Sequence, residues 1–301
     1  MESPVLWGID LGGTKIEGAI VNPTAPDKPL SRVRRDTQAS RGYEHIIEGI
    51  CRLVEDLERA SGLNRPARIG VGTPGVVDPA VGGMKNSNTV CLNNRSFRED
   101  LSSALGCQAV LANDANCFAL AEATWGAARG MHVVMGLILG TGVGGGIVTG
   151  GRVLNGLHGI AGEWGHNPIP GETRRCYCGR VGCVETVIAG PSLERFHREL
   201  GGAPLRLPEI VAQAAEGSPY AVETLSRLRE KFGQSIAAVI NILDPDAIVI
   251  GGGVGNVSLL YDQETRAAIR RHLFNSDLKT RILKPLLGDS AGVFGAAKLT
   301  V

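Results

Sequence analysis

Short apolar runs that open into glycine-rich loops restrict the fold of this chain more than any other feature of its sequence. Runs at residues 69–72, 133–139 and 247–250 have the length and composition of buried strands. Segments with a helical spacing of apolar residues alternate with such runs, and the clearest spans residues 43–61, where Gly62 ends the helix. This alternation predicts an α/β protein whose functional site lies along the carboxyl ends of its strands.

The length of the chain predicts two domains. Its 301 residues exceed what one ordinary hydrophobic core holds, because single cores stop growing at roughly 250 to 300 residues. Both halves open with a strand, a glycine turn and a second strand, in the first half at residues 5–10 and 16–21. This repeated order of elements fits a duplicated fold.

The composition excludes two classes of partner. The chain has 31 basic and 30 acidic residues, so we expect neither a nucleic acid nor an anionic membrane as its partner. No apolar run approaches the roughly 20 residues that a membrane span requires, and the N-terminus lacks the pattern of a signal peptide. The sequence therefore predicts a soluble protein with a small-molecule partner.

Two glycine-rich turns are candidate phosphate-binding loops. In the first, Asp10 ends a strand before a turn at residues 12–14, where N–H groups and a hydroxyl can approach a phosphate while the carboxylate faces its magnesium ion. An ordinary hairpin turn is the alternative. The second, at residues 140–146, matches G-x-G-x-x-G, but a hairpin follows where a dinucleotide-binding fold requires a helix. We interpret it as another phosphate loop, and the P-loop signature is absent from the sequence.

Asp114 is the candidate catalytic base. It follows Asn113 at the end of a predicted strand and precedes a predicted helix over residues 116–128. An aspartate at such a position is commonly only a helix N-cap. A sugar hydroxyl that attacks ATP needs a carboxylate within hydrogen-bond reach, and a strand-end aspartate facing the glycine loops provides one.

A cluster of one histidine and three cysteines predicts a zinc site. One imidazole and three thiolates are a set that zinc accepts in closed tetrahedral sites, and they belong to His166, Cys176, Cys178 and Cys183. A closed shell leaves no position for water, so the predicted zinc is structural; a redox or unliganded cluster is the alternative. Thiolate ligands and scattered free cysteines both favour a reducing compartment, and we expect the protein in the cytoplasm.

Two carboxylates flank the predicted zinc ligands. Glu163 precedes His166, and Glu185 follows Cys183. A folded zinc segment would hold both carboxylates near one point. Carboxylates held in this way suit sugar hydroxyls, and two surface glutamates on a loop are the alternative.

Taken together, these motifs resemble those of the ROK family (repressors, open reading frames, kinases). The resemblance runs from about residue 5 to residue 298, and the ordered set of motifs is specific. The matching segments lie at residues 10–15, 72–75, 113–116, 139–146, 163–166, 176–185 and 244–253.

The resemblance implies two ribonuclease-H-like lobes of the actin-like ATPase class, with an active-site cleft between the lobes. The small lobe is expected at residues 1–114, with residues 287–301 returning to it. The large lobe is expected at residues 115–286 and includes the zinc segment 166–183. The resemblance also implies a homodimer.

The resemblance further implies roles for individual residues, with Asp114 as the base that takes the proton from the 6-hydroxyl of a hexose. The residues implied to bind Mg²⁺ and ATP are Asp10, Gly12, Gly13, Thr14, Lys15, Gly140, Thr141, Gly142, Gly251, Gly252 and Gly253. Those implied to surround the sugar are Gly75, Asn88, Asn113, Asp114, Glu163, His166 and Glu185.

These roles predict an ATP-dependent hexose 6-kinase. Residues 86–93 and 163–168 look most like the fructokinase and mannokinase branch, whereas residues 113–120 and 135–146 also look like N-acetylglucosamine kinases. We expect fructose or mannose as the substrate, with an N-acetylglucosamine kinase or a glucokinase as the alternative. A non-catalytic sugar-binding regulator is the alternative of another class, although repressors of the family carry a helix-turn-helix domain for which the residues before Asp10 leave no room.

Overall fold

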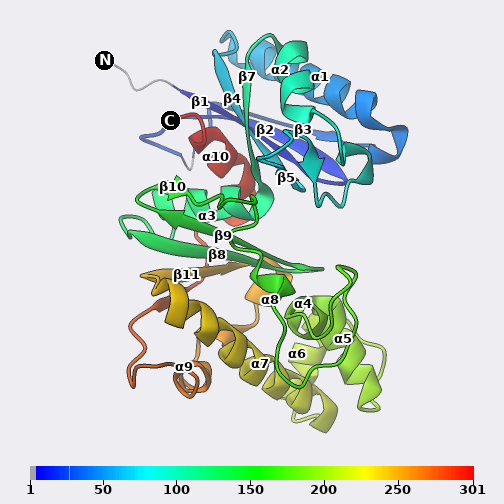
Figure 1. Cartoon of the computed structure of the whole chain (residues 1–301), viewed down its shortest axis with the longest axis vertical. Coiled ribbons are helices and arrows are strands. Elements are labelled where there is room, and N and C mark those ends of the chain that lie inside the picture. Colours follow the sequence, from blue (N-terminus) through cyan, green and yellow to red (C-terminus); the bar gives the residue numbers. More distant parts are fainter. Residues whose placement is uncertain (1–4, 27) are drawn as a thin grey trace. The chain divides into compact units, whose positions relative to one another are not determined.

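The computed structural model describes residues 5–26 and 28–301, whose contacts group into two compact units (Figure 1). The first unit comprises the chain up to Arg129 with Gly151–Ala161 and Leu286–Val301, and the second comprises Gly130–Gly150 and Gly162–Pro285. This division differs from the boundary after residue 114 that the sequence predicts, because it keeps helix α3 (Asp114–Thr124) in the first unit. Residues 1–4 and 27 of the predicted small lobe lie outside the described residues.

The first unit contains a five-stranded mixed sheet with the strand order β3-β2-β1-β4-β7. Strand β2 runs antiparallel to β1 and to β3, whereas β4 runs parallel to β1 and to β7. The predicted hairpin with its glycine turn is therefore confirmed as β1 and β2. The strands are β1 (Leu6–Leu11), β2 (Lys15–Val21), β3 (Ser31–Asp36), β4 (Arg68–Thr73) and β7 (Gln108–Asn113), and a separate two-stranded ribbon joins β5 (Val76–Val77) to β6 (Met84–Lys85).

A second five-stranded sheet of the order β10-β9-β8-β11-β12 repeats this topology, and its strands β8, β9, β11 and β12 belong to the second unit. Strands β8 and β9 form an antiparallel hairpin, as β1 and β2 do in the first sheet. Strand β11 runs parallel to β8 and to β12, as β4 does to β1 and to β7. The duplicated fold suggested by the sequence is thus confirmed. The strands are β8 (Val133–Leu139), β9 (Val143–Thr149), β10 (Arg152–Val153), β11 (Ala247–Gly251) and β12 (Arg281–Leu283).

Helices cover both faces of the first sheet (Figure 1). On one face, α1 (Tyr43–Ser61) has the predicted bounds and buries an apolar stripe that includes Ile46, Ile50 and Leu53. On the other face lie α3 and α10 (Ala291–Lys298). Helix α2 (Phe97–Leu105) packs beside α1 and adds Phe97 and Leu101 to the same core.

In the second unit, the long helix α7 (Pro219–Leu243) supplies much of the core. Its side chains Phe232 and Ile236 are fully buried with Leu137 of β8 and Ile250 of β11. A helix begins at Gln263, because Asp262 caps it by accepting a hydrogen bond from the Thr265 N–H at 2.7 Å. The remaining helices are α4 (Glu185–Ile188), α5 (Gly190–Glu199), α6 (Leu207–Ala215), α8 (Gly252–Gly255) and α9 (Gln263–Arg270).

No helix among the described residues is long and apolar enough to cross a membrane.

Helix α10 packs in unusually close contact with its neighbours, because glycines remove side chains at the contact points. A Cβ at Gly70 of β4 would lie 1.7 Å from the Ala296 carbonyl oxygen, and one at Gly8 of β1 would lie 2.2 Å from the Val293 oxygen. On the opposite side of the helix, a Cβ at Gly295 would lie 1.7 Å from the carbonyl oxygen of Cys117 in α3. The last helix of the chain therefore contacts both the sheet and α3 through backbone atoms.

A fully buried carboxylate holds the point at which the chain returns to the first unit. Glu122 of α3 has no solvent-exposed surface. Its Oε1 accepts hydrogen bonds from the N–H groups of Leu286 and Leu287, at 3.1 and 3.0 Å, and its Oε2 accepts one from Ala127 at 2.8 Å. These charge-assisted bonds offset the cost of burying the carboxylate.

We expect Gly295→Ala to lower the free energy of unfolding by at least about 2 kcal/mol, because overpacking a core costs roughly 1–3 kcal/mol and the clashing atoms belong to backbone. Urea denaturation followed by circular dichroism measures this loss. The matched control is Gly49→Ala in α1, where the nearest atom, Ile16 Cδ1, is 3.6 Å from the new Cβ. This control should gain about 0.5–1 kcal/mol from helix propensity. Equal stability of Gly295→Ala and the parent protein would contradict the packing argument.

Candidate active site

The first predicted phosphate loop is the turn between β1 and β2. The Gly12 N–H donates to the Lys15 carbonyl at 3.0 Å and closes the turn. Buried Thr37 fixes it from outside, with its hydroxyl donating to the Gly12 carbonyl at 2.6 Å and its N–H donating to the Thr14 carbonyl at 2.9 Å. No sequence motif surrounds Thr37, so the sequence does not predict these hydrogen bonds to the turn.

Two carboxylates lie at the carboxyl edge of the first sheet. Asp10 is near the end of β1, and Asp114 directly follows β7, which reaches the same edge because β1, β4 and β7 are parallel. Burial raises the pKa of Asp10 to about 6, and the charge of Asp114 contributes to the increase, followed by that of Glu17. A pair of adjacent carboxylates that repel each other is a favourable place for a divalent cation or a proton.

Asp114 is not the helix N-cap. The cap of α3 is Asn113, whose side-chain oxygen accepts a hydrogen bond from the Asn116 N–H at 2.8 Å. The Asp114 carboxylate accepts one from its neighbour Ala115 at 2.8 Å and is otherwise exposed to solvent. Desolvation by the surrounding protein raises the pKa of Asp114.

The predicted sugar-binding loops of the first unit contact one another. Thr73 pairs with Asn113 across β4 and β7, and the Thr73 hydroxyl donates to the Gly75 carbonyl at 2.8 Å. A Cβ at Gly75 would lie 2.8 Å from Ser87 Cα, so the loop that carries exposed Asn88 packs directly on Gly75. Gly75, Asn88 and Asn113 thus come from three loops at one edge of the sheet.

In the second unit, the predicted phosphate loop lies against Glu185. The Gly140 N–H donates to the Gly142 carbonyl at 2.9 Å, and Glu185 Oε2 accepts from the Val143 N–H at 2.9 Å. Gly251 pairs with Ile138 at the ends of β11 and β8, which brings the loop at residues 251–253 beside this turn. A predicted sugar ligand and both predicted nucleotide loops of this unit are therefore neighbours.

A close backbone contact brings the predicted sugar-binding segment to the start of β9. A Cβ at Gly165 would lie 2.2 Å from the Val143 carbonyl oxygen, so only glycine permits this approach. Buried Trp164 anchors the segment, with its indole N–H donating to the Ser235 carbonyl at 3.2 Å. Glu163 and His166 flank this anchor, at either end of one short 3₁₀ turn.

The structure brings the four predicted zinc ligands together. Their ligand atoms all lie within 4.8 Å of one another. Cys178 Sγ and Cys183 Sγ are 3.6 Å apart, and Cys176 Sγ and His166 Nδ1 are 3.7 Å apart. Sulfurs bound to zinc at about 2.3 Å in a tetrahedron are separated by about 3.8 Å. The donor set and its spacing therefore fit a zinc ion held through Nδ1 of the histidine.

Tyr177 is a site residue that the sequence reasoning missed. Its hydroxyl lies 3.2 Å from Nε2 of His166, the imidazole nitrogen on the side away from Cys176, and its ring packs edge-on against the imidazole. The side chain is otherwise 82% exposed. A polar aromatic residue between two zinc ligands is the only signal that the sequence offers for this contact.

The predicted site residues form two groups, one in each unit. The first group is Asp10, Gly12, Gly13, Thr14, Lys15, Gly75, Asn88, Asn113 and Asp114. The second group is Gly140, Thr141, Gly142, Glu163, His166, Cys176, Cys178, Cys183, Glu185, Gly251, Gly252 and Gly253.

The raised pKa of Asp10 predicts a pH-dependent stability. In the unfolded chain its pKa stays near the ordinary value of about 3.9, so between that pH and about 6 the folded protein binds more protons, and stability falls as the pH rises. Asp10→Asn removes the charge, and we expect it to melt at a higher temperature than the parent at pH 7.5 but not at pH 4. Calorimetry in buffer without divalent cations measures both.

The control for this experiment is Asp36→Asn, which removes an exposed carboxylate from the same unit. It should gain no stability at pH 7.5 relative to pH 4. A similar gain for Asp36→Asn and Asp10→Asn would show that net charge, and not the environment of Asp10, causes the effect.

Known proteins match the chain over both units. The model of the ROK family matches residues 6–301. An N-acetyl-D-glucosamine kinase from Photobacterium profundum is 35% identical over 307 residues, which cover 98% of this chain and 99% of that protein. The crystal structure of a ROK hexokinase from Thermus thermophilus shares 34% identity and a TM-score of 0.87, covering 98% of this chain and 97% of that one.

A ROK family glucokinase from Streptomyces griseus, solved with glucose and AMPPNP, shares 29% identity and a TM-score of 0.78, covering 98% of this chain and 99% of that one. These similarities confirm the predicted α/β fold class of ribonuclease-H-like units. Because the family model and the relatives match nearly the whole length, the chain belongs to the ROK family.

Proposed function

We propose that this chain is an ATP-dependent kinase that phosphorylates the 6-hydroxyl of N-acetylglucosamine. The observation that carries the proposal is the near-complete similarity, at 35% identity, to a relative named N-acetyl-D-glucosamine kinase. The charge interaction between Asp10 and Asp114, and the contact of Glu185 with the turn between β8 and β9, support the proposal.

The choice of sugar differs from the one that short motifs favour. Residues 86–93 and 163–168 favour fructose or mannose by resemblance, whereas similarity over the whole chain supports N-acetylglucosamine. We give precedence to the whole chain, because a few loop residues sample the substrate pocket less completely. Fructose, mannose and glucose remain the competing substrates.

Asp114 is the proposed catalytic base. Its carboxylate accepts the proton of the sugar 6-hydroxyl as the oxygen of that hydroxyl attacks the γ-phosphorus of ATP and ADP leaves. The carboxylate is free for this step because Asn113, and not Asp114, caps the helix. Its raised pKa makes it a stronger base than an ordinary aspartate.

The two glycine turns are the proposed phosphate sites, since their N–H groups can approach phosphate oxygens without side chains in the way. Residues 12–14 and 140–142 would bind the phosphates, and residues 251–253 would lie by the adenosine. Mg²⁺ bound to ATP supplies neutralisation of the developing phosphate charge. The Asp10 carboxylate would face this ion, which would offset the repulsion that raises the pKa of Asp10.

The proposed sugar ligands in the second unit depend on the metal segment. His166, Cys176, Cys178 and Cys183 would hold zinc in a closed shell, so the metal supplies structural order there and not a reactive water. With Nδ1 on the metal, the His166 imidazole can offer Nε2 to a sugar hydroxyl. The ordered segment would also position Glu163 and Glu185. One oxygen of the Glu185 carboxylate, Oε2, accepts a hydrogen bond from the Val143 N–H, and a sugar hydroxyl would bind the other oxygen.

Coupled ATP assays with N-acetylglucosamine, mannose, fructose and glucose test this function. We expect the highest kcat/KM for N-acetylglucosamine, by at least about tenfold, because unpaired polar groups in a pocket built for another sugar carry a penalty of that order. Preference for fructose or mannose would overturn the sugar assignment alone. Calorimetric sugar binding without turnover for any sugar would instead indicate a regulator.

Asp114→Asn should lower kcat by about 10²- to 10⁴-fold while sugar binding survives, because base catalysis is lost but positioning remains. Asp36→Asn, an exposed aspartate of the same unit, is the matched control and should retain parental kcat. Turnover of Asp114→Asn within tenfold of the parent would rule out the base role. A melting curve like that of the parent ensures that the loss is catalytic.

The metal proposal predicts about one zinc per chain in protein purified without chelator. Cys178→Ser should lose the metal and weaken sugar binding, measured by elemental analysis and calorimetry, because the segment that carries Glu163 and Glu185 loses its order. Cys51→Ser, at a cysteine of α1 outside the cluster, should retain both. Less than about half a zinc per chain, together with full activity of Cys178→Ser, would refute a structural zinc.

A further inference from the structure

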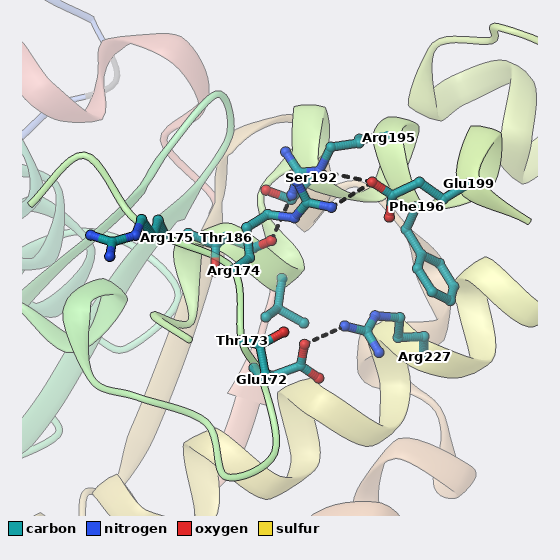
Figure 2. A pocket seen from close by; sticks show the side chains of 11 residues that line it. Glu172, Thr173, Arg174, Arg175, Thr186, Ser192, Arg195, Phe196, Glu199 and Arg227 are labelled. Carbon is teal, nitrogen blue, oxygen red and sulfur yellow. Dashed lines mark hydrogen bonds and ion pairs between the residues drawn. The ribbon is translucent and has the colours of Figure 1, made fainter. Parts of the chain in front are cut away.

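A polar cavity of about 380 Å³ lies within the second unit, beside the segment that holds the predicted zinc ligands (Figure 2). Residues 172–175, helices α4 and α5, and Arg227 of α7 line it. None of these residues has a role in the proposed phosphoryl transfer. The cavity is within the range of small-molecule sites, about 300 to 1,000 Å³, but its lining is mostly polar where such sites are usually apolar.

The charges of the lining favour an anion. Four arginines and two glutamates line the cavity, and because Arg175 points away from the others (Figure 2), the remaining groups carry an excess of one positive charge. Glu172 is already paired with Arg227 at 2.6 Å and with Lys231 at 2.9 Å, so its charge is neutralised by groups on α7. Arg174 is paired with Glu199 at 2.5 Å, and Arg195 converges on the same carboxylate (Figure 2).

Arg195 has an unused hydrogen-bond donor at this position. One of its Nη groups donates to the Thr186 carbonyl at 2.8 Å, but its buried Nε has no acceptor among the described residues. The nearest carboxylate oxygen, on Glu199, is 3.9 Å from Nε, too far for a hydrogen bond. Burial and the charge of Arg174 both lower the pKa of Arg195, so its environment disfavours the positive charge. Protein atoms cover Nε in this conformation, so an anionic oxygen in the cavity would reach this donor after a rotation of the guanidinium group.

We propose that this cavity is a binding site for a small phosphate-bearing ligand, with Arg195 and Arg174 as its principal contacts. Guanidinium groups present N–H donors in a planar fork that matches phosphate oxygens, and the Thr173 hydroxyl borders the same space. The cavity volume exceeds that of a phosphate group alone and leaves room for an organic body of about the size of a sugar. The ligand is therefore a phosphate monoester or inorganic phosphate.

The site is connected to the proposed active site through α4. Thr186, which Arg195 binds, lies next to Glu185, and the Ser192 hydroxyl in the cavity wall donates to the Glu185 carbonyl at 2.9 Å. The Thr186 hydroxyl donates to the carbonyl of the zinc ligand Cys183 at 2.7 Å. A ligand in the cavity would thus contact the reverse side of the helix that carries Glu185.

Isothermal titration calorimetry with inorganic phosphate and with a hexose 6-phosphate, in chloride buffer, tests the proposal. The protein is first saturated with a non-hydrolysable ATP analogue and with the hexose, so that substrate sites are filled. We expect saturable binding that Arg195→Met weakens by at least about tenfold, the usual loss for a charge-assisted bond. Arg198→Met, which removes an exposed arginine of the same helix, should change the affinity by less than about twofold.

Arg174→Met is a second variant, at a more exposed position, and it should also weaken binding. It keeps the proposal testable if Arg195→Met does not fold. Tighter binding of the hexose 6-phosphate than of phosphate identifies an organic ligand, and equal binding identifies inorganic phosphate. The proposal is overturned if the parent shows no saturable binding, or if Arg195→Met and Arg174→Met bind as the parent does. The readout is binding and not turnover, so failure here leaves the proposed kinase activity untouched.

Discussion

The close backbone contact between α10 and the first sheet is the constraint on which the first unit depends. Gly8, Gly70 and Gly295 remove the side chains that would separate this helix from β1, β4 and α3. The contact also sets the site, since a Cβ at Gly292 would lie 2.7 Å from the Asp10 carboxylate oxygen. The final segment of the chain thus forms one wall around a residue near its beginning. Buried Glu122 holds the returning chain in place through backbone N–H groups.

This packing has an electrostatic consequence for the carboxylates at the sheet edge. Asp10 is surrounded by the helix and by neighbouring acidic groups, so its charged form is disfavoured without a cation. Burial also raises the pKa of Asp114, but this residue keeps solvent-exposed surface and lacks the acidic neighbours that add to the effect at Asp10. The two aspartates are close in space but have different environments. That difference is consistent with the separate roles proposed for them, one beside the cation of the nucleotide and the other as the base.

In the second unit, the four-residue helix α4 connects the predicted site residues to one another. Its first residue, Glu185, binds the β8–β9 turn through the Val143 N–H, and the zinc ligand Cys183 lies just before it. Its next residue, Thr186, accepts a bond from Arg195 in the polar cavity. The nucleotide loop, the metal segment and the cavity therefore share one short element. All three therefore contact the element that carries the Glu185 carboxylate.

The sequence by itself determined the features that depend on local pattern: the α/β class, α1 with its bounds, the glycine turns, the strand end at Asn113 and Asp114, and a ligand set whose spacing fits zinc. The cap of α3 is Asn113, whereas the sequence offered only Asp114 for that position. It did not predict β3, whose run Ser31–Asp36 is mainly charged, or α10, whose two glycines weaken a helical pattern. Tertiary structure alone decided the roles of Thr37, Glu122, Tyr177 and Arg195, because each acts through partners distant in sequence or not fixed by spacing. Periodicity and turn chemistry act over a few residues, whereas these contacts exist only after the strands and helices have packed.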